Sequence, residues 1–313
     1  MTAGTWSVSV WMLAGASVLF GVVGPHLAHR MRPRAATWIL SGGSVLVAAS
    51  SVAVPALFVV ALLGQWTPLA AVGHWSAAWL RSSPQSRSGA TAVALAVLLV
   101  QMLRVIRLGW RHGRPLLAAW GEARRIAEPL VVIPGADLSA FAVPGWPGCI
   151  VATSGLVQQL TPGQRRAVLA HEQAHLDAHH DLHVTAAELA AAVNPLMARV
   201  PAAIRLTAER WADEVAAASV SDRRLVAETI GQVAVRNYES RRRPVFALSA
   251  AGADVVQRVG SLLDRPPRRH LLLEGLLIGA AGAAVAASLL AAYDINHLFE
   301  MAERTYRAAA AIR

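Results

Sequence analysis

The sequence contains no lysine, so arginine alone carries its positive charge. The 29 basic residues outnumber 19 acidic ones, which gives a formal net charge of +10. Cys149 is the only cysteine, and a single cysteine excludes an intrachain disulfide. Without lysine the chain also lacks a Ser-x-x-Lys motif, which excludes covalent catalysis by the serine nucleophile of such a motif. Internal repeats and glycine-rich phosphate loops are absent as well.

Charged residues are scarce at 15%, whereas 55% of the chain is hydrophobic. This composition is too apolar for a purely soluble protein and indicates membrane spans. Four apolar runs are long enough to cross a bilayer, and they lie at about 6–27, 37–64, 90–109 and 271–293. The first run is too long and too weakly basic at its start for a typical cleaved signal peptide. We therefore expect a membrane domain at 1–110 with three spans, a soluble domain at 111–270, a fourth span and a short tail at 294–313.

Arginine is distributed unevenly around these runs. It is frequent between runs one and two, after run three and before run four, whereas the loop 65–89 has two arginines and three tryptophans. Arginine-rich loops stay in the cytoplasm, and tryptophans favour the membrane interface. We expect a multi-pass protein of the bacterial inner membrane, with its N-terminus and tail outside and the domain 111–270 in the cytoplasm. Basic residues beside apolar runs favour membrane lipid as a partner and argue against direct nucleic-acid binding.

The sequence His171-Glu172-x-x-His175 lies in a helical pattern that begins at Thr161 and continues to about residue 193. Thr161 is a suitable N-cap, and Pro162 suits the first helical position. Residues four apart lie on one helix face, so the two histidines can bind one metal ion, with Glu172 beside them as a proton acceptor. The further histidines nearby are interpreted as incidental, and they are His179, His180 and His183.

A catalytic zinc site needs three protein ligands and one open position. Glu209 lies about thirty residues downstream in a second helical pattern, and we expect it to be the third ligand. Asp213 is one turn later on the same face, where it can orient a ligand histidine. The alternative interpretation, a solvated acidic face, suits Glu214 better, because apolar residues surround Glu209 and Asp213.

Three short strands precede the histidine motif, at 130–133, 140–143 and 149–153, each next to a Pro-Gly pair. A small sheet before a helical body predicts an α+β domain. An edge strand over the zinc site would bind an extended peptide by backbone pairing. The candidate for this strand is the segment that contains Ile150, Val151, Ala152 and Thr153, and an ordinary core strand is the alternative.

Together these segments resemble a membrane-embedded metallopeptidase of the zincin-like gluzincin class, and they lie at 150–156, 160–162, 168–175 and 209–213. Two groups share the signature, the HtpX or CAAX-protease-like group and the BlaR/MecR antirepressor group. Three spans, a cytoplasmic zinc domain and a fourth span are similar to the BlaR/MecR type. The resemblance implies one Zn²⁺ per chain held by His171, His175 and Glu209, with Glu172 as catalytic base and Asp213 in support.

The resemblance also implies a regulatory role, the cleavage of a cytosolic winged-helix repressor under cell-envelope or antibiotic stress. Full-length β-lactam receptors carry a penicillin-binding sensor domain after the fourth span, and we expect none here. Two alternatives stay open. One is an HtpX-like protease for quality control of membrane proteins, and the other is a non-enzymatic membrane receptor with a structural zinc site.

Overall fold

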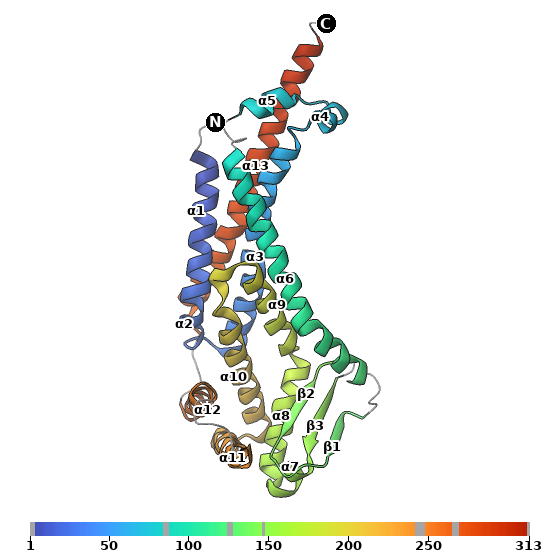
Figure 1. Cartoon of the computed structure of the whole chain (residues 1–313). Helices are drawn as coiled ribbons and strands as arrows, with labels where there is room; N and C mark the ends of the chain where they lie inside the picture. The colour runs from blue at the N-terminus through green and yellow to red at the C-terminus, as the bar shows by residue number, and fades with distance from the viewer. Residues whose placement is uncertain are drawn as a thin grey trace.

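A computed structural model describes residues 4–83, 88–123, 128–145, 148–241, 248–264 and 269–311. Within these ranges, four helices are long and apolar enough to cross a membrane, at Ser7–Ala28, Pro33–Leu63, Gly89–Arg111 and Leu271–Ala310. The four apolar runs in the sequence thus coincide with four candidate spans, judged by length and composition. These helices form a bundle at one end of an elongated molecule, and a small sheet with shorter helices lies at the other end (Figure 1).

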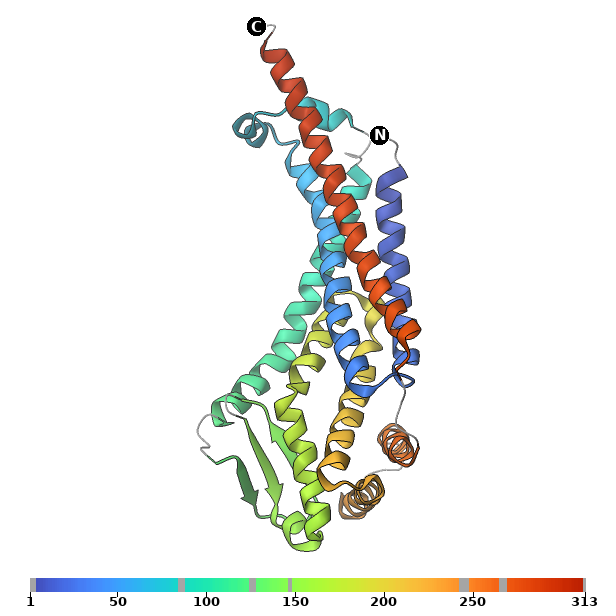
Figure 2. The ribbon, with the colours of Figure 1, turned by 180° about the vertical axis from the view of Figure 1, so that it is seen from behind.

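The bundle consists of four helical stretches that lie side by side in both views (Figures 1 and 2). Their bounds are α1 (Gly4–Val18) with its continuation through a π-helical turn η1 (Leu19–Val23) and α2 (Gly24–Ala28), then α3 (Pro33–Leu63), α6 (Ser88–Ala123) and α13 (Leu271–Ala310). Small side chains of α13 are buried where it meets α1 and α3, among them Ala284, Ala287 and Ala291. Small residues let helix backbones approach closely, which is how membrane helices pack.

The last helix is longer than the sequence indicated. α13 continues without a break past Tyr293 to Ala310, so most of the expected tail belongs to the helix of the fourth span. Alanine-rich sequence favours the helix. Two short helices follow the second span, α4 (Thr67–Gly73) and α5 (Ala77–Ser82), and α5 packs against α13. The amide of Ser76 donates to the carbonyl of Ala302 at 3.0 Å, and the ring of Trp75 packs edge-on against Phe299. The loop that follows the second span therefore folds onto the end of α13.

The sheet contains the three strands that the sequence predicted, β1 (Leu130–Ile133), β2 (Ala140–Val143) and β3 (Cys149–Thr153). Their order is β1-β3-β2, with β1 parallel and β2 antiparallel to β3. The expectation of an edge strand at Ile150, Val151, Ala152 and Thr153 was wrong. Both edges of β3 are paired and all five of its residues are buried, since an unbroken apolar run suits a strand covered on both faces.

The other helices of the described residues are α7 (Ser154–Gln159), α8 (Pro162–Asp177), α9 (His180–Val193), α10 (Val200–Val220), α11 (Arg223–Arg241) and α12 (Leu248–Leu263). The helix expected from Thr161 to about 193 is in fact two helices. The backbone of His179 adopts the left-handed conformation, with φ of 48°, and this residue separates α8 from α9. This break places His180, at the start of α9, against His175 of α8.

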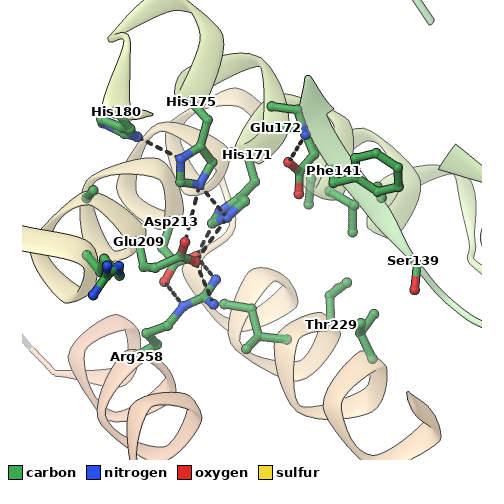
Figure 3. A pocket seen from close by; sticks show the side chains of 18 of the residues that line it. Ser139, Phe141, His171, Glu172, His175, His180, Glu209, Asp213, Thr229 and Arg258 are labelled. Carbon is green, nitrogen blue, oxygen red and sulfur yellow. Dashed lines mark hydrogen bonds and ion pairs between the residues drawn. The ribbon is translucent and has the colours of Figure 1, made fainter. Parts of the chain in front are cut away.

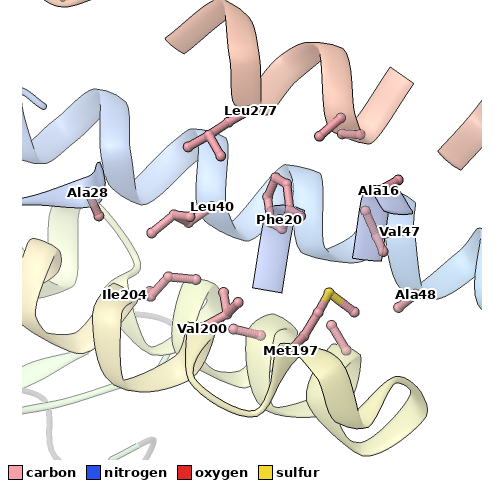
Figure 4. Close-up of a cluster of buried hydrophobic side chains, with 14 of the residues drawn as sticks. Ala16, Phe20, Ala28, Leu40, Val47, Ala48, Met197, Val200, Ile204 and Leu277 are labelled. Atoms are coloured by element: carbon pink, nitrogen blue, oxygen red, sulfur yellow. The ribbon is translucent and has the colours of Figure 1, made fainter. Parts of the chain in front are cut away.

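The hairpin of α9 and α10 packs into the bundle. A 3₁₀ turn η3 (Pro195–Met197) forms its tip. Met197, Val200 and Ile204 share one core with residues of the candidate spans, including Phe20, Leu40 and Leu277 (Figure 4). The segment 111–270 is therefore not a body separate from the spans, because part of its core is the core of the bundle.

Polar contacts and two close approaches hold the tip of this hairpin. The side-chain amide of Asn194 donates to the hydroxyls of Ser17 and Ser51 at 2.9 Å each. A Cβ on Gly21 would collide with the carbonyl oxygen of Leu196, so only glycine lets the first span approach the tip so closely. The hairpin thus depends on specific residues in both of the first two spans.

Candidate metal centre

The helix α8 presents two histidines to one point. Its start is as predicted, with a capping box in which the Thr161 side chain accepts from the Gln164 amide and the Gln164 side chain accepts from the Thr161 amide. Pro162 occupies the first turn. From this fixed start, His171 and His175 follow one turn apart on the same face. The helix therefore sets their spacing locally, before any tertiary contact is made.

Glu209 of α10 completes a group of three candidate ligands (Figure 3). The Nε2 atoms of His171 and His175 lie 3.1 Å apart. The Glu209 carboxylate lies 3.5 Å from Nε2 of His171 and 3.6 Å from Nε2 of His175. Zinc bonds of about 2.0–2.1 Å in a tetrahedral arrangement separate neighbouring ligand atoms by about 3.3 Å. The three side chains thus have the spacing and the chemistry of a zinc site.

The other ring nitrogen of each histidine also has a partner. Nδ1 of His171 lies 3.0 Å from Oδ1 of Asp213, as the shared face of α10 predicted. Nδ1 of His175 lies 2.9 Å from Nδ1 of His180, which is buried and packs edge-on against Trp211. Such partners fix the orientation of a metal-binding imidazole. The interpretation of His180 as incidental was wrong, because the break at His179 turns it back toward the site.

Arg258 of α12 was missed by the sequence analysis. Its guanidinium donates two hydrogen bonds to the Asp213 carboxylate, at 2.7 and 2.8 Å, and its Nη1 lies 2.8 Å from Glu209 (Figure 3). Arg258 is far from the motif in sequence and lies in a helix of mixed composition. An arginine at such a position carries a weak signal, since its partners are known only once α12 packs against α10.

Charges in the site shift the pKa values in opposite directions. Burial alone would lower the pKa of His171, but hydrogen bonds to Asp213 and Glu209 raise it to about 9. Burial and the neighbouring His171 lower the pKa of His175 to about 4. Burial acts against ionisation of Glu209, yet His171 and Arg258 lower its pKa to about 2. In the metal-free site, one proton on His171 thus occupies the position between the ligands, and a metal ion would displace it.

Glu172 faces β2 from the other side of α8. Its Oε2 accepts a hydrogen bond from the backbone amide of Ala142 at 2.9 Å. Burial raises the pKa of Glu172. Because the Ala142 amide points away from β3, the edge of β2 that faces Glu172 is the one β3 does not use. The strand that lies over the site is therefore β2.

A pocket of about 780 Å³ encloses these groups. All three candidate ligands and Glu172 line it, together with β2. Part of its lining is apolar and includes Leu138, Leu156, Val168, Val226, Ile230 and Val233. This volume lies within the range of ligand-binding pockets, roughly 300–1,000 Å³.

Comparison with known proteins identifies this part of the chain. No match was found among curated proteins or among solved structures. Residues 117–263 match the model of Peptidase family M48, whose members are zinc metallopeptidases, and this stretch contains all of the pocket residues described above. The BlaR/MecR-type resemblance is not confirmed by this match and stays a prediction. The chain therefore carries a Peptidase family M48 domain at residues 117–263, combined with four candidate membrane-spanning helices.

Proposed function

We propose that this protein is a membrane-bound, zinc-dependent endopeptidase of the gluzincin class. One observation carries the proposal, the meeting of His171, His175 and Glu209 in one pocket with the carboxylate of Glu172. Three protein ligands that leave a further position open are typical of catalytic zinc sites, whereas structural sites are closed by four. The match to Peptidase family M48 supports the same chemistry.

The chain's own residues divide the work of peptide hydrolysis. When bound, zinc would polarise the scissile carbonyl and lower the pKa of the attacking water. Glu172 accepts the proton of that water and later delivers it to the leaving amine. Its raised pKa suits both transfers, because a group that titrates nearer to neutral pH both takes up and releases a proton readily. Asp213 and His180 keep the two imidazoles in place.

The substrate backbone would pair with β2. Alternate backbone groups of a strand point to the same side, so Ala140 presents its amide and carbonyl in the same direction as Ala142. An extended peptide that added itself to this edge would lie beside Glu172 and the candidate ligands. The apolar wall below β2 would then accept a large apolar side chain next to the scissile bond. In this proposal, β2 takes the role that the sequence analysis gave to β3.

The arginine asymmetry supports a cytoplasmic position for the pocket. A cytosolic winged-helix repressor is accordingly the first substrate to test, as the resemblance to the BlaR/MecR type implies. Reporter fusions at α4 and at the end of α11 test the topology. We expect them to report opposite sides of the membrane, and the same side for both would remove one span from this arrangement.

A second candidate function rests on the α9–α10 hairpin. Glu209 lies on α10, whose first turns pack among the candidate spans, so the pocket lies close to the membrane. This proximity favours quality control of membrane proteins, whose cleavage sites lie near the bilayer. Under this alternative, the wild-type protein lowers the amounts of many membrane proteins.

The test compares the wild type with Glu172→Gln, each expressed with the repressor. We expect the variant to retain zinc and to lose cleavage by about 10²–10⁴-fold, because the ligands stay while the proton acceptor is removed. Gln173→Ala is the matched control, since this exposed neighbour on α8 does not line the pocket. Equal loss of the repressor with wild type and Glu172→Gln would exclude proteolysis and favour a receptor. Loss of many membrane proteins with the wild type alone would favour quality control.

A further inference from the structure

We propose that a groove between α3 and the α8–α9–α10 unit binds one anionic glycerophospholipid. The groove has a volume of about 610 Å³ and shares no lining residue with the metal pocket. One wall comes from the second candidate span, and the other comes from the end of α8, the first half of α9 and the middle of α10. A ligand in this groove would lie between the membrane helices and the peptidase domain.

The wall from α3 runs from the expected headgroup level into the bilayer. Its lining residues recur every three or four positions along one helix face, and they are Arg34, Trp38, Ser41, Gly42 and Val45. From Arg34 to Val45 the helix rises by about 16 Å. One leaflet of the hydrocarbon core is about 15 Å thick. The groove is therefore long enough to hold an acyl chain along its length, with its only arginine at the end where the span begins.

The side chains in the groove are those expected to contact lipid. Trp38, Val45 and Leu182 line it with 56%, 47% and 52% of their surfaces exposed. In water such exposure would be unfavourable, whereas against acyl chains these side chains are in suitable surroundings. Trp38 also packs edge-on against His183, whose Nδ1 lies 2.7 Å from the hydroxyl of Ser41. These contacts order the apolar wall without filling the groove.

The charges at the entrance favour an anionic headgroup. The guanidinium of Arg34 lies over the ring of Trp211, 5.6 Å from its centre, and is exposed on its other side. Arginine binds phosphate through paired hydrogen bonds. The acidic residue of the groove, Asp177, accepts a hydrogen bond from Gln173 on its own helix.

The groove also adjoins the metal centre through one side chain. Trp211 contacts Arg34 on the groove side and packs against His180, and His180 in turn contacts His175. Two side chains, Trp211 and His180, therefore connect Arg34 to the candidate metal ligand His175. Lipid binding itself does not depend on peptidase activity, so the experiment below measures binding alone.

The experiment measures lipid retained by the purified full chain in detergent, using native mass spectrometry. Phosphatidylglycerol and phosphatidylcholine with identical acyl chains are the two probes. We expect phosphatidylglycerol to bind more tightly, and Arg34→Gln to weaken its binding by about fivefold while leaving phosphatidylcholine unchanged, the size expected for one arginine near anionic lipid. Arg32→Gln is the control, because Arg32 is exposed nearby but does not line the groove. Equal binding of both lipids, or equal effects of the two substitutions, would overturn the proposal.

A second pair of variants tests the location. Gly42 lines the groove, and a Cβ placed on it meets nothing within 4 Å. Gly42→Leu should therefore fold normally, occupy the groove and reduce retention of both lipids. Gly15→Leu adds the same side chain at another open position, on the first span. If Gly42→Leu retains as much phosphatidylglycerol as Gly15→Leu does, the lipid does not bind in this groove.

Discussion

Nδ1 of His171 lies 3.0 Å from Oδ1 of Asp213, and this carboxylate receives two further hydrogen bonds from Arg258. The contacts join α8, α10 and α12 in a single chain of charged groups (Figure 3). Asp213 is almost completely buried, and hydrogen bonds from Arg258 and His171 lower its pKa despite its burial. The position of His171 therefore depends on its own helix, α8, and also on Arg258 of α12, which lies more than eighty residues further along the chain.

Arg258→Gln tests this chain of contacts. Removing the guanidinium leaves a buried carboxylate with one partner fewer, which should lower the free energy of unfolding by about 3–5 kcal/mol. Zinc affinity should fall by about 10–100-fold, the usual effect of losing a group that orients ligands. Arg258→Lys should restore only part of the zinc affinity, because an ammonium group cannot bind a carboxylate through two parallel hydrogen bonds. Thermal unfolding and zinc titration measure the two effects.

The control for this variant is Arg223→Gln. Arg223 pairs with Glu214 and donates to carbonyls of α12, but it reaches none of the candidate ligands. Its loss should lower stability without changing zinc affinity. If Arg258→Gln also leaves zinc affinity unchanged, Arg258 serves the packing of α12 alone.

Glu209→Ala tests the third ligand. The purified wild-type protein should contain about one zinc ion per chain, because the described part of the chain forms one group of candidate ligands. The variant should contain much less zinc and keep its helical content, since the core of the bundle does not involve this side chain. Metal analysis and circular dichroism measure these quantities. Glu214→Gln, five residues further along α10, is the control and should keep its zinc. Unchanged zinc content in Glu209→Ala would show that another residue is the third ligand.

The stability of the metal-free protein should be greatest near pH 6.5. The folded pKa of His171 is about 9, above its ordinary 6.5, so its contribution is complete below pH 6.5 and is lost as the pH rises to about 9. The folded pKa values of His175 and His180 are lowered to about 4 and 3. Protonation therefore favours the unfolded chain as the pH falls below 6.5.

Thermal unfolding of chelator-treated protein between pH 4 and 9 measures this profile. Zinc should abolish the alkaline decline, because the metal replaces the proton on His171. His171→Gln should also lack the alkaline decline while keeping the acid one. A stability that rises steadily from pH 6.5 to 9 in the metal-free protein would contradict the assigned direction.

Gly21→Ala tests the insertion of the α9–α10 hairpin among the spans. The added methyl group collides with the carbonyl of Leu196, a backbone atom that cannot rotate away. We expect a loss of about 1–3 kcal/mol in unfolding free energy, the usual cost of overpacking. Gly15→Ala, earlier on the same span, should be neutral or slightly stabilising, since a Cβ there meets nothing within 4 Å. Equal thermal stability of the two variants would mean that the hairpin does not approach the first span.

Several features follow from the sequence alone because they depend on local interactions. Helical spacing places His171 and His175 on one face, and the Thr161 and Gln164 capping box sets where that helix begins. The four apolar runs predict four candidate spans because composition over about twenty residues is sufficient for that purpose. Glu209 and Asp213 were found because they lie one turn apart in a second helical pattern.

Other features were decided by contacts between distant segments. The order β1-β3-β2 depends on which strands pair. The apolar sequence of β3 does not indicate whether the strand is central or at an edge of the sheet. His180 reaches His175 only because His179 adopts a left-handed conformation, which a histidine rarely does without tertiary support. Arg258 gains its role only when α12 packs against α10, since a guanidinium can pair with whichever carboxylate the fold brings within reach. The sequence by itself predicted the candidate ligands and the candidate spans, and the tertiary structure decided which strand lies over the site and which residues hold the candidate ligands in place.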